Sequence, residues 1–385
     1  MDKTGDLLDI TAAVAVGADK PFETTALTLR SPGPGELLVR VVATGICHTD
    51  VHTKINAFCE FPMVLGHEGA GVVESIGSGV EGFAVGDHVI MTYDFCGTCA
   101  QCETDSPSYC DKHGELNFSG VRPDGNKTHR TLEGQRPDVG GSFFQQSSFA
   151  THALANERNT IKVDSSLPLP ILAPLGCGVQ TGAGTVLNTL DAQPGTTLAV
   201  FGCGCVGLSA VMAAKVAGVE NIIAIDLHQS RLDLALELGA THALNPGEVD
   251  GGDGLLAAVA EVRPGGCHYA IDTTGNPNVL RQAFDACGPM GVTAMIAPGV
   301  PGTEVSVEMM GLLPGKSLRG VVQGDSVSSE FIPRLIDLWK DGQFPFDRLV
   351  TTFDGLDSLD DAVNAMGAGD VIKPVVLIDS SYDQH

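Results

Sequence analysis

GCGCVG, residues 202–207, is the stretch of sequence that decides the fold. It follows an apolar, strand-like run and opens a helical one, and the next strand-like run ends in Asp226. In this context Gly202, Gly204 and Gly207 match a dinucleotide-binding fingerprint. The glycines let the backbone approach a pyrophosphate, and the helix N-terminus attracts its negative charge.

Asp226 predicts which dinucleotide is bound. Its carboxylate can accept hydrogen bonds from free ribose hydroxyls, whereas it would repel a 2′-phosphate, so NAD is favoured over NADP. Arg231 acts in the opposite direction, because a cation near the ribose would attract a 2′-phosphate.

Strand-like and helical runs alternate beyond about residue 167, which predicts an α/β region with a doubly wound parallel sheet. The expected strands are 197–201, 221–226, 268–272, 291–297 and 317–322, with helices at 208–217 and 229–238. Two further helices, 329–340 and 358–366, and a strand, 373–378, are expected near the end. The earlier part, 10–90, consists of short β-runs broken by glycine and predicts an all-β, partly barrel-like region. Residues 112–141 show no period and predict a long loop.

Composition excludes several classes of partner. The 385 residues carry 47 acidic and 22 basic side chains, a formal charge of -25, so nucleic acid and anionic membranes are not expected partners. The first residues lack a signal-peptide pattern, and the long uncharged runs at 167–190 and 193–214 are interrupted by proline or glycine. We therefore expect a cytoplasmic protein of two domains, whose 11 cysteines are metal ligands or buried thiols rather than disulfides.

Four cysteines within one short segment form the most specific metal-binding pattern. They are Cys96, Cys99, Cys102 and Cys110. Four sulfurs on one turning loop can surround zinc tetrahedrally and leave no open position, which predicts a structural ion. An iron–sulfur cluster and unrelated thiols are the alternatives.

Three other residues could hold a second zinc. Cys47 lies in GICHTDVH (45–52), His67 in GHEG and Cys177 in LGCG. Alone, each of the two cysteines is a candidate buried thiol and the histidine a structural residue. Together, two thiolates and one imidazole leave one coordination position open, as in catalytic zinc sites. Thr49 and His52, three residues apart, would share one face of a helical turn and could pass a proton between them.

The chain resembles the zinc-dependent medium-chain alcohol dehydrogenases over essentially its whole length. The motifs that carry the resemblance are GICHTDVH (45–52), GHEGAG (66–71), CGTCAQCETDSPSYC (96–110), LGCGVQTGAGTVLN (175–188) and GCGCVG (202–207) with Asp226. A further segment, SFFQQSSFATHALANERN (142–159), is similar to the branch that oxidises benzylic and allylic terpene alcohols.

The resemblance implies a GroES-like, β-rich catalytic domain and a Rossmann coenzyme domain. The first would comprise 1–179 and 323–385, and the second 180–322. It also implies a homo-oligomer, either a dimer or a tetramer.

The resemblance also implies a role for each matching residue. Cys47, His67 and Cys177 would hold a catalytic zinc, with Glu68 behind it as an occasional fourth ligand, and the four clustered cysteines would hold the structural zinc. Thr49 and His52 match the proton relay. His48 would face the cofactor pyrophosphate, Thr181 and Val206 would pack against the nicotinamide, and Phe143 and Phe144 would line the substrate channel.

We therefore expect an enzyme that oxidises primary aromatic or allylic alcohols to aldehydes, reversibly, with hydride transfer to NAD. One alternative is another dehydrogenase of the same fold, acting on aliphatic primary alcohols, polyols or a formaldehyde–thiol adduct. Cys177 argues against a polyol enzyme, which commonly has a carboxylate in its place. An adduct enzyme needs cations at the pocket mouth, for which Arg122, Lys127 and Arg130 are candidates. A non-enzymatic zinc- and nucleotide-binding protein is the second alternative.

Overall fold

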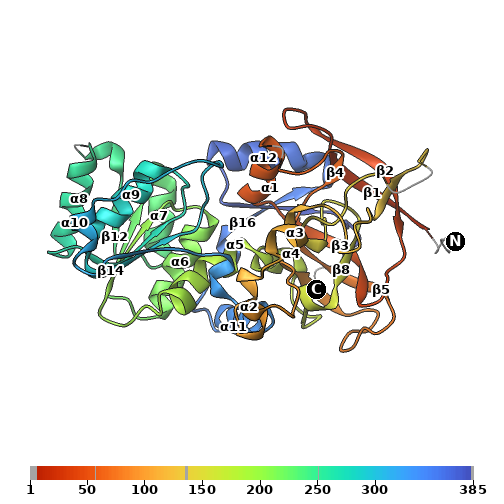
Figure 1. The fold of residues 1–385 in the computed structure, drawn as a ribbon, viewed down its shortest axis with the longest axis horizontal. Helices are drawn as coiled ribbons and strands as arrows, with labels where there is room; N and C mark the ends of the chain where they lie inside the picture. Colours follow the sequence, from red (N-terminus) through yellow and green to blue (C-terminus); the bar gives the residue numbers. More distant parts are fainter. Residues whose placement is uncertain (1–6, 57, 135–137, 250, 383–385) are drawn as a thin grey trace. The chain divides into compact units, whose positions relative to one another are not determined.

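The structure, a computed structural model, describes residues 7–56, 58–134, 138–249 and 251–382, so the predicted absence of a signal at the first six residues falls outside it. The chain divides into two compact units (Figure 1). Unit 1 takes in Met1–Cys177, Val327–Pro333 and Asp347–His385, and unit 2 takes in Gly178–Ser326 and Arg334–Phe346. The domain boundaries inferred from sequence, 179/180 and 322/323, remain a prediction.

Unit 2 contains a parallel six-stranded sheet. Its strands are β10 (Thr197–Phe201), β11 (Asn221–Ile225), β12 (His242–Leu244), β13 (Cys267–Asp272), β14 (Cys287–Met295) and β15 (Ser317–Gly320). The strand order is β12-β11-β10-β13-β14-β15. Strands β11 and β12 are added on one side of β10, and β13 to β15 on its other side, as in doubly wound dinucleotide-binding folds. All five residues of β10, TLAVF, are buried, because helices cover both faces of a parallel sheet. The predicted sheet is confirmed.

In unit 2 one helix precedes the first strand of the sheet, and the others alternate with the strands in sequence. These helices are α5 (Gly178–Gly184), α6 (Cys205–Val216), α7 (Gln229–Leu238), α8 (Gly251–Val262), α9 (Pro277–Ala286) and α10 (Met309–Leu312). Helix α11 (Ser328–Lys340) spans the division between the units. Backbones approach closely where α5 meets α6, since a Cβ atom on Gly182 would lie 2.0 Å from the carbonyl oxygen of Val206. Only glycine fits there.

Unit 1 is rich in β-structure. Its strands are β1 (Leu7–Ala15), β2 (Phe22–Arg30), β3 (Glu36–Gly45), β4 (Met63–Val64), β5 (Glu68–Ile76), β6 (His88–Met91), β7 (His129–Thr131), β8 (His152–Asn156), β9 (Thr160–Val163), β16 (Val350–Asp354) and β17 (Lys373–Leu377). They form a four-stranded sheet, β4-β1-β2-β7, and a seven-stranded one, β16-β17-β3-β5-β6-β9 with β8 paired to β3. The late strand β17 lies directly beside β3, although most of the chain separates them in sequence.

Short helices complete unit 1: α1 (His48–Ile55), α2 (Ala100–Glu103), α3 (His113–Phe118), α4 (Leu169–Leu172) and α12 (Leu359–Ala368). The prediction that 112–141 is only loop was wrong, because α3 and β7 lie within it. Both elements are too short to show a period, and β7 depends on pairing with the distant strand β2. Residues 135–137 of this segment are outside the described part.

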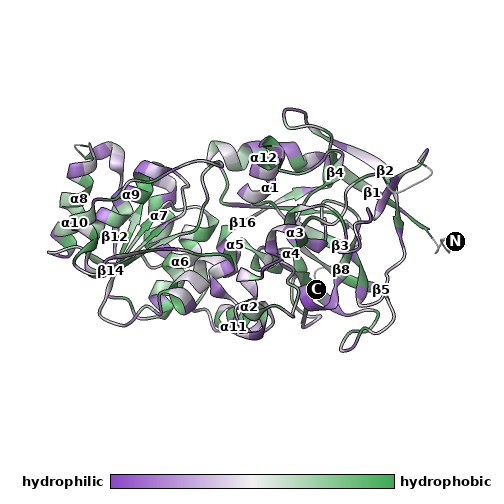
Figure 2. Ribbon diagram, viewed as in Figure 1, coloured by the Kyte–Doolittle hydropathy of each residue, from purple (hydrophilic) through white to green (hydrophobic). Residues whose placement is uncertain are grey.

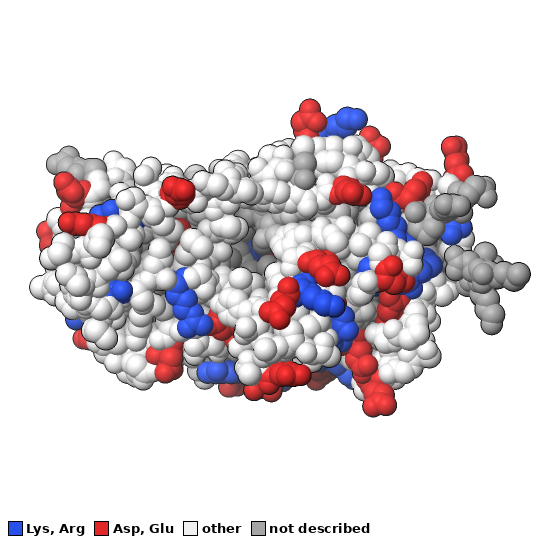
Figure 3. Space-filling view, in the orientation of Figure 1, with Lys and Arg blue, Asp and Glu red and all other residues white. Residues whose placement is uncertain are grey.

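Hydrophobic residues run along the strands of both units, and the covering helices carry mixed hydropathy (Figure 2). Acidic side chains are spread over the visible face, with basic ones between them (Figure 3). In the described ranges, no helix is long and apolar enough to cross a bilayer.

Candidate active site and zinc centres

Four potential metal ligands gather in unit 1. One ligand atom from each of Cys47, His67, Glu68 and Cys177 lies within 4.8 Å of the other three. Cys47 precedes α1, His67 precedes β5, and Cys177 ends the segment 173–177. His67 and Glu68 have no exposed surface, and Cys177 has 8%. The cluster predicted from three separate motifs therefore exists in the fold.

Asp50, on the first turn of α1, connects two of these ligands. Its Oδ2 accepts the backbone N–H of Cys47 at 3.0 Å, and its Oδ1 lies 2.9 Å from Nδ1 of His67 and accepts the N–H of Gly66 at 3.1 Å. This contact directs the imidazole so that Nε2 is left for another partner. Nε2 is buried and has no hydrogen-bond partner among the residues that the structure describes. A buried nitrogen without a partner, beside two cysteine sulfurs, fits a zinc ion.

The thiols of the cluster differ in acidity. A hydrogen bond from Cys177 lowers the pKa of Cys47 well below its ordinary value, with a further contribution from His67. The same thiol pair, together with burial, raises the pKa of Cys177 well above its ordinary value. Burial would lower the pKa of His67, but Asp50 and Cys47 outweigh it and raise the value to about 10. Zinc binding would therefore displace protons from the cluster.

Lys373, on β17, neutralises Glu68. Its Nζ lies 3.0 Å from both carboxylate oxygens and donates to the carbonyl of Ile46 at 2.9 Å. The lysine is 2% exposed, so this is a buried ion pair. Such a pair is costly to break, because the remaining charge would be left in an apolar environment.

Phe143 and Phe144 pack against the imidazole of His67. The ring of Phe144 stacks on it at 4.4 Å between centroids, and that of Phe143 meets it edge-on at 5.5 Å. Phe143 is 0% exposed and Phe144 is 3% exposed, and both belong to the core of unit 1. Their predicted role in lining the substrate channel remains a prediction.

Thr49 and His52 both lie on α1, as the relay requires. The hydroxyl of Thr49 is 3.6 Å from the sulfur of Cys47, and its side chain is partly buried. His52 is exposed, as is His48 at the start of the helix. Of the two relay residues, Thr49 therefore lies beside the cluster and His52 lies at the surface.

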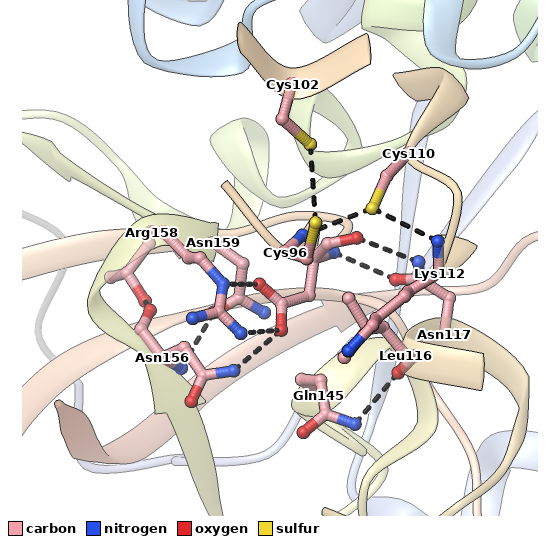
Figure 4. Close-up of polar contacts among 12 residues, drawn as sticks. Cys96, Cys102, Cys110, Lys112, Leu116, Asn117, Gln145, Asn156, Arg158 and Asn159 are labelled. Carbon is pink, nitrogen blue, oxygen red and sulfur yellow. Dashed lines mark hydrogen bonds and ion pairs between the residues drawn. The ribbon is translucent and has the colours of Figure 1, made fainter. Parts of the chain in front are cut away.

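The four clustered cysteines also converge, as the spacing predicted. Sulfur atoms of Cys96, Cys99, Cys102 and Cys110 all lie within 4.8 Å of one another. Figure 4 shows three of them, Cys96, Cys102 and Cys110. Backbone N–H groups donate to them: Cys96 to the sulfur of Cys110 at 3.2 Å, and Thr98 to that of Cys96 at 3.4 Å. The N–H of Thr98 lowers the pKa of Cys96 to about 6. Donors aimed at sulfur favour thiolates, the form that binds zinc.

A buried carboxylate anchors this loop. Asp94 has no exposed surface, pairs with Arg158 at 2.6 Å and accepts from Asn156 at 2.8 Å. Figure 4 labels these two partners, Arg158 and Asn156. Its backbone exchanges two hydrogen bonds with the amide of Asn117. The chain that leads into Cys96 is thereby fixed at its start.

Unit 2 presents the dinucleotide fingerprint between β10 and α6. Gly202 has a φ of 92°, and a Cβ on Gly207 would lie 1.8 Å from the carbonyl oxygen of Gly202. A Cβ on Gly204 would meet nothing within 4 Å, so this side of the loop is open to a ligand. Val206, in the first turn of α6, is partly exposed.

Asp226 holds the glycine loop in place. Its carboxylate accepts the N–H of Cys203 at 2.7 Å and that of His228 at 2.8 Å. Arg231 lies 3.9 Å from the same carboxylate. Thr181, on α5, donates to the amide oxygen of Gln323 at 3.4 Å.

Two family models match the chain: the alcohol dehydrogenase GroES-like domain at residues 33–165 and the zinc-binding dehydrogenase at residues 205–341. Geraniol dehydrogenase from Castellaniella defragrans is 40% identical, over 98% of this chain and 100% of its own length. The chain belongs to the zinc-binding alcohol dehydrogenase family. The predicted family, fold class and enzyme class are confirmed.

Other family members are similar over nearly the full length. The crystal structure of benzyl alcohol dehydrogenase from Acinetobacter calcoaceticus is 42% identical, with a TM-score of 0.92 and coverage of 97% of this chain and 100% of that one. Alcohol dehydrogenase class-3 from Caenorhabditis elegans is 34% identical, over 97% of this chain and 98% of its own.

The sequence did not reveal several residues that support the metal cluster of this alcohol dehydrogenase. Asp50 and Lys373 contact the side chains of ligand residues. Gln146 contacts the backbone of His67, and Thr92 contacts that of Gly176, the residue before Cys177. The one available sequence signal was Lys373 itself, a charged residue that starts an apolar strand.

Replacing Cys99 should remove one zinc and destabilise the protein. Cys99→Ala opens the closed four-sulfur site, so we expect loss of one metal per chain and a melting temperature lower by at least about 5 °C. Metal analysis and thermal unfolding measure both. Cys59→Ala, at a partly buried cysteine outside both clusters, is the control. An unchanged zinc content in Cys99→Ala would show that these cysteines are only thiols.

Proposed function

We propose that this alcohol dehydrogenase oxidises primary alcohols carrying an aromatic or allylic group to the aldehydes, reversibly, with NAD as hydride acceptor. One observation carries the proposal: the ligand atoms of Cys47, His67, Glu68 and Cys177 lie within 4.8 Å of one another. The similarity to the geraniol and benzyl alcohol dehydrogenases supports the substrate class.

Two zinc ions per chain are part of the proposal. Cys47, Nε2 of His67 and Cys177 would hold the catalytic ion, and the four-cysteine cluster would hold the structural one. Bound zinc supplies Lewis acidity, which lowers the pKa of a hydroxyl group. Glu68 remains paired with Lys373, so its charge is balanced without the metal.

In this mechanism two side chains of α1 carry the proton of the alcohol hydroxyl away. Thr49 accepts the proton of the alcohol at its Oγ1 and passes its own outward, and the exposed His52 imidazole releases it to water. The hydride transfer is the chemistry of the nicotinamide. The protein contributes alignment of the donor carbon and exclusion of water.

Most of the residues that we propose to bind the cofactor belong to unit 2. Gly202, Gly204 and Gly207 would let the pyrophosphate approach α6, and Asp226 would accept from the ribose hydroxyls. The remaining contacts follow the resemblance: His48 to the pyrophosphate, and Thr181 and Val206 to the nicotinamide.

A formaldehyde–thiol adduct as substrate is less well supported. Of the cations considered for its recognition, Arg122 is 3% exposed and donates to the Gln145 amide and the Leu154 carbonyl at 2.9 and 2.7 Å. A guanidinium held in this way is not at a pocket mouth. Turnover of a free apolar alcohol without added thiol would distinguish the two substrate classes.

We also infer a homo-oligomer in a reducing, cytoplasmic setting. All four residues of the edge strand β15 are exposed, and Met290, Met309 and Leu313 are exposed by 73% or more. An open edge beside apolar side chains suits a second copy of the chain. No cysteine in the described part of the chain forms a disulfide, as expected of metal-binding thiols. A monomer mass by light scattering would contradict the oligomer.

Substitutions on α1 should separate the two steps of the relay. Thr49→Val removes the first acceptor, so we expect kcat to fall roughly 10²–10⁴-fold at every pH, whereas Thr49→Ser keeps the hydroxyl and most of the activity. His52→Gln should cost only about tenfold, because water can replace an exposed group. Steady-state kinetics with and without added buffer base test this. Wild-type rates in His52→Gln would exclude His52 from the relay.

Asp226→Asn should narrow the preference for NAD over NADP. Asparagine keeps an acceptor oxygen for the glycine loop but removes the charge that repels a 2′-phosphate, and Arg231 is then free to attract it. The ratio of kcat/KM for the two cofactors is the measurement. A wild-type enzyme that already prefers NADP would mean that Arg231, not Asp226, governs the choice.

Benzyl alcohol and geraniol should be better substrates than ethanol and 2-propanol. Burying a phenyl-sized group contributes about 1.5–3 kcal/mol, which corresponds to roughly tenfold to a hundredfold in kcat/KM. A panel of the four alcohols, followed through NADH absorbance, measures the ratio. Ethanol used as well as benzyl alcohol would reject the aromatic pocket formed by Phe143 and Phe144 but not the zinc assignment.

A further inference from the structure

The side chain of Gln146 connects the turn that carries His67 to Thr92, the residue that follows strand β6. Its Nε2 donates to the carbonyl of His67 at 2.9 Å and to that of Thr92 at 3.1 Å. Its Oε1 accepts the N–H of Gly69 at 3.1 Å. Gln146 has no exposed surface, so water cannot replace these contacts. The amide therefore fixes the turn on both sides of Glu68.

Thr92 continues this connection to the third metal ligand. Its Oγ1 donates to the carbonyl of Gly176 at 2.7 Å, next to Cys177. Its N–H donates to the carbonyl of Asn159 at 2.9 Å, so the threonine is itself fixed. Thr92 is 1% exposed. The backbone of Gly176 packs closely against the end of β6, since a Cβ there would lie 2.4 Å from the carbonyl oxygen of Met91.

The contacts of Gln146 and Thr92 join the one made by Asp50, which links Cys47 to His67. The three segments that hold Cys47, His67 and Cys177 are thus connected in series by buried side chains.

We propose that Gln146 and Thr92 are positioning residues that set the separation of His67 and Cys177, and thereby the zinc affinity of the cluster. This inference rests on the zinc assignment made under the proposed function. Zinc requires its ligands within about 0.2 Å of ideal distances, and residues that orient ligands typically change metal affinity roughly 10- to 100-fold. The cluster needs this support because its ligands come from separate segments of the chain.

Gln145 provides a matched control for Gln146. It is the neighbouring residue, is equally buried, and donates from Nε2 to the carbonyls of Leu116 and Val121 at 2.8 and 3.0 Å. Its Oε1 accepts from Arg122 at 2.9 Å. Gln145→Met and Gln146→Met thus remove the same chemical group and similar hydrogen bonds, but only the second loosens a metal-ligand segment.

The experiment measures the rate of zinc release from the holoenzyme to excess chelator with a colorimetric zinc indicator, beside the melting temperature. We expect Gln146→Met to release one zinc per chain roughly tenfold faster than wild type, while the second zinc leaves at the wild-type rate. Gln145→Met should lower the melting temperature by a similar amount and release both ions at wild-type rates. Equal acceleration in both variants would reduce Gln146 to a loop-stability residue and overturn the proposal.

A second pair of variants keeps the proposal testable if Gln146→Met does not fold. Thr92→Val removes the hydroxyl at constant volume and should release the same zinc faster, and Thr92→Ser keeps the hydroxyl and should behave as wild type. In the cobalt-substituted enzyme, Thr92→Val should shift the visible absorption bands that report ligand geometry, and Thr92→Ser should not. A Thr92→Val variant with wild-type release and spectrum would overturn the role of Thr92.

Failure of this inference differs from failure of the proposed function. A wild-type enzyme with one zinc per chain, unchanged in Cys47→Ser, would remove the zinc assignment itself. Two zinc ions in wild type, with wild-type release in both Gln146→Met and Thr92→Val, would overturn only the positioning roles.

Discussion

Buried negative charge is the constraint on which unit 1 depends. Two cysteine sulfurs and the carboxylates of Asp50 and Glu68 meet in a region with almost no solvent contact. Such a site is stable only if cations or donors neutralise it. Lys373 supplies one positive charge, backbone N–H groups and the His67 imidazole satisfy Asp50, and a bound zinc ion would supply the remainder. The strand pairing of β17 with β3 matters because it brings Lys373 to this place.

The two units use a carboxylate in the same way. Asp50 accepts the N–H groups of Cys47 and Gly66, and Asp226 accepts those of Cys203 and His228. Each acid therefore shapes the loop beside it before any ligand arrives. Hydrogen bonds to a charged acceptor are stronger than neutral ones, which suits loops that have little secondary structure of their own. Binding then requires less ordering of the protein.

The sequence predicted features that depend on local pattern and missed those that depend on distant contacts. β10 and α7 matched because apolar runs and helical periods are local, and the cysteine spacing identified its own cluster. The residues that position the cluster of Cys47, His67 and Cys177 were not predictable from the sequence. Lys373 is 305 residues from Glu68, and Thr92 is 84 residues from Gly176. No period or motif records such pairs, because only the folded topology brings them together.

The ion pair between Glu68 and Lys373 also has a consequence for biosynthesis. The ribosome makes Glu68 305 residues before Lys373, so during most of translation the carboxylate has no partner cation. An unpaired charge cannot be buried at low cost, and the nascent segment 45–76 must keep this carboxylate in contact with water or a chaperone. We therefore expect the metal cluster to close only after β17 leaves the ribosome. Zinc loading at this centre would then be a late step, whereas the four-cysteine loop, contained within 96–110, can bind its ion while synthesis continues.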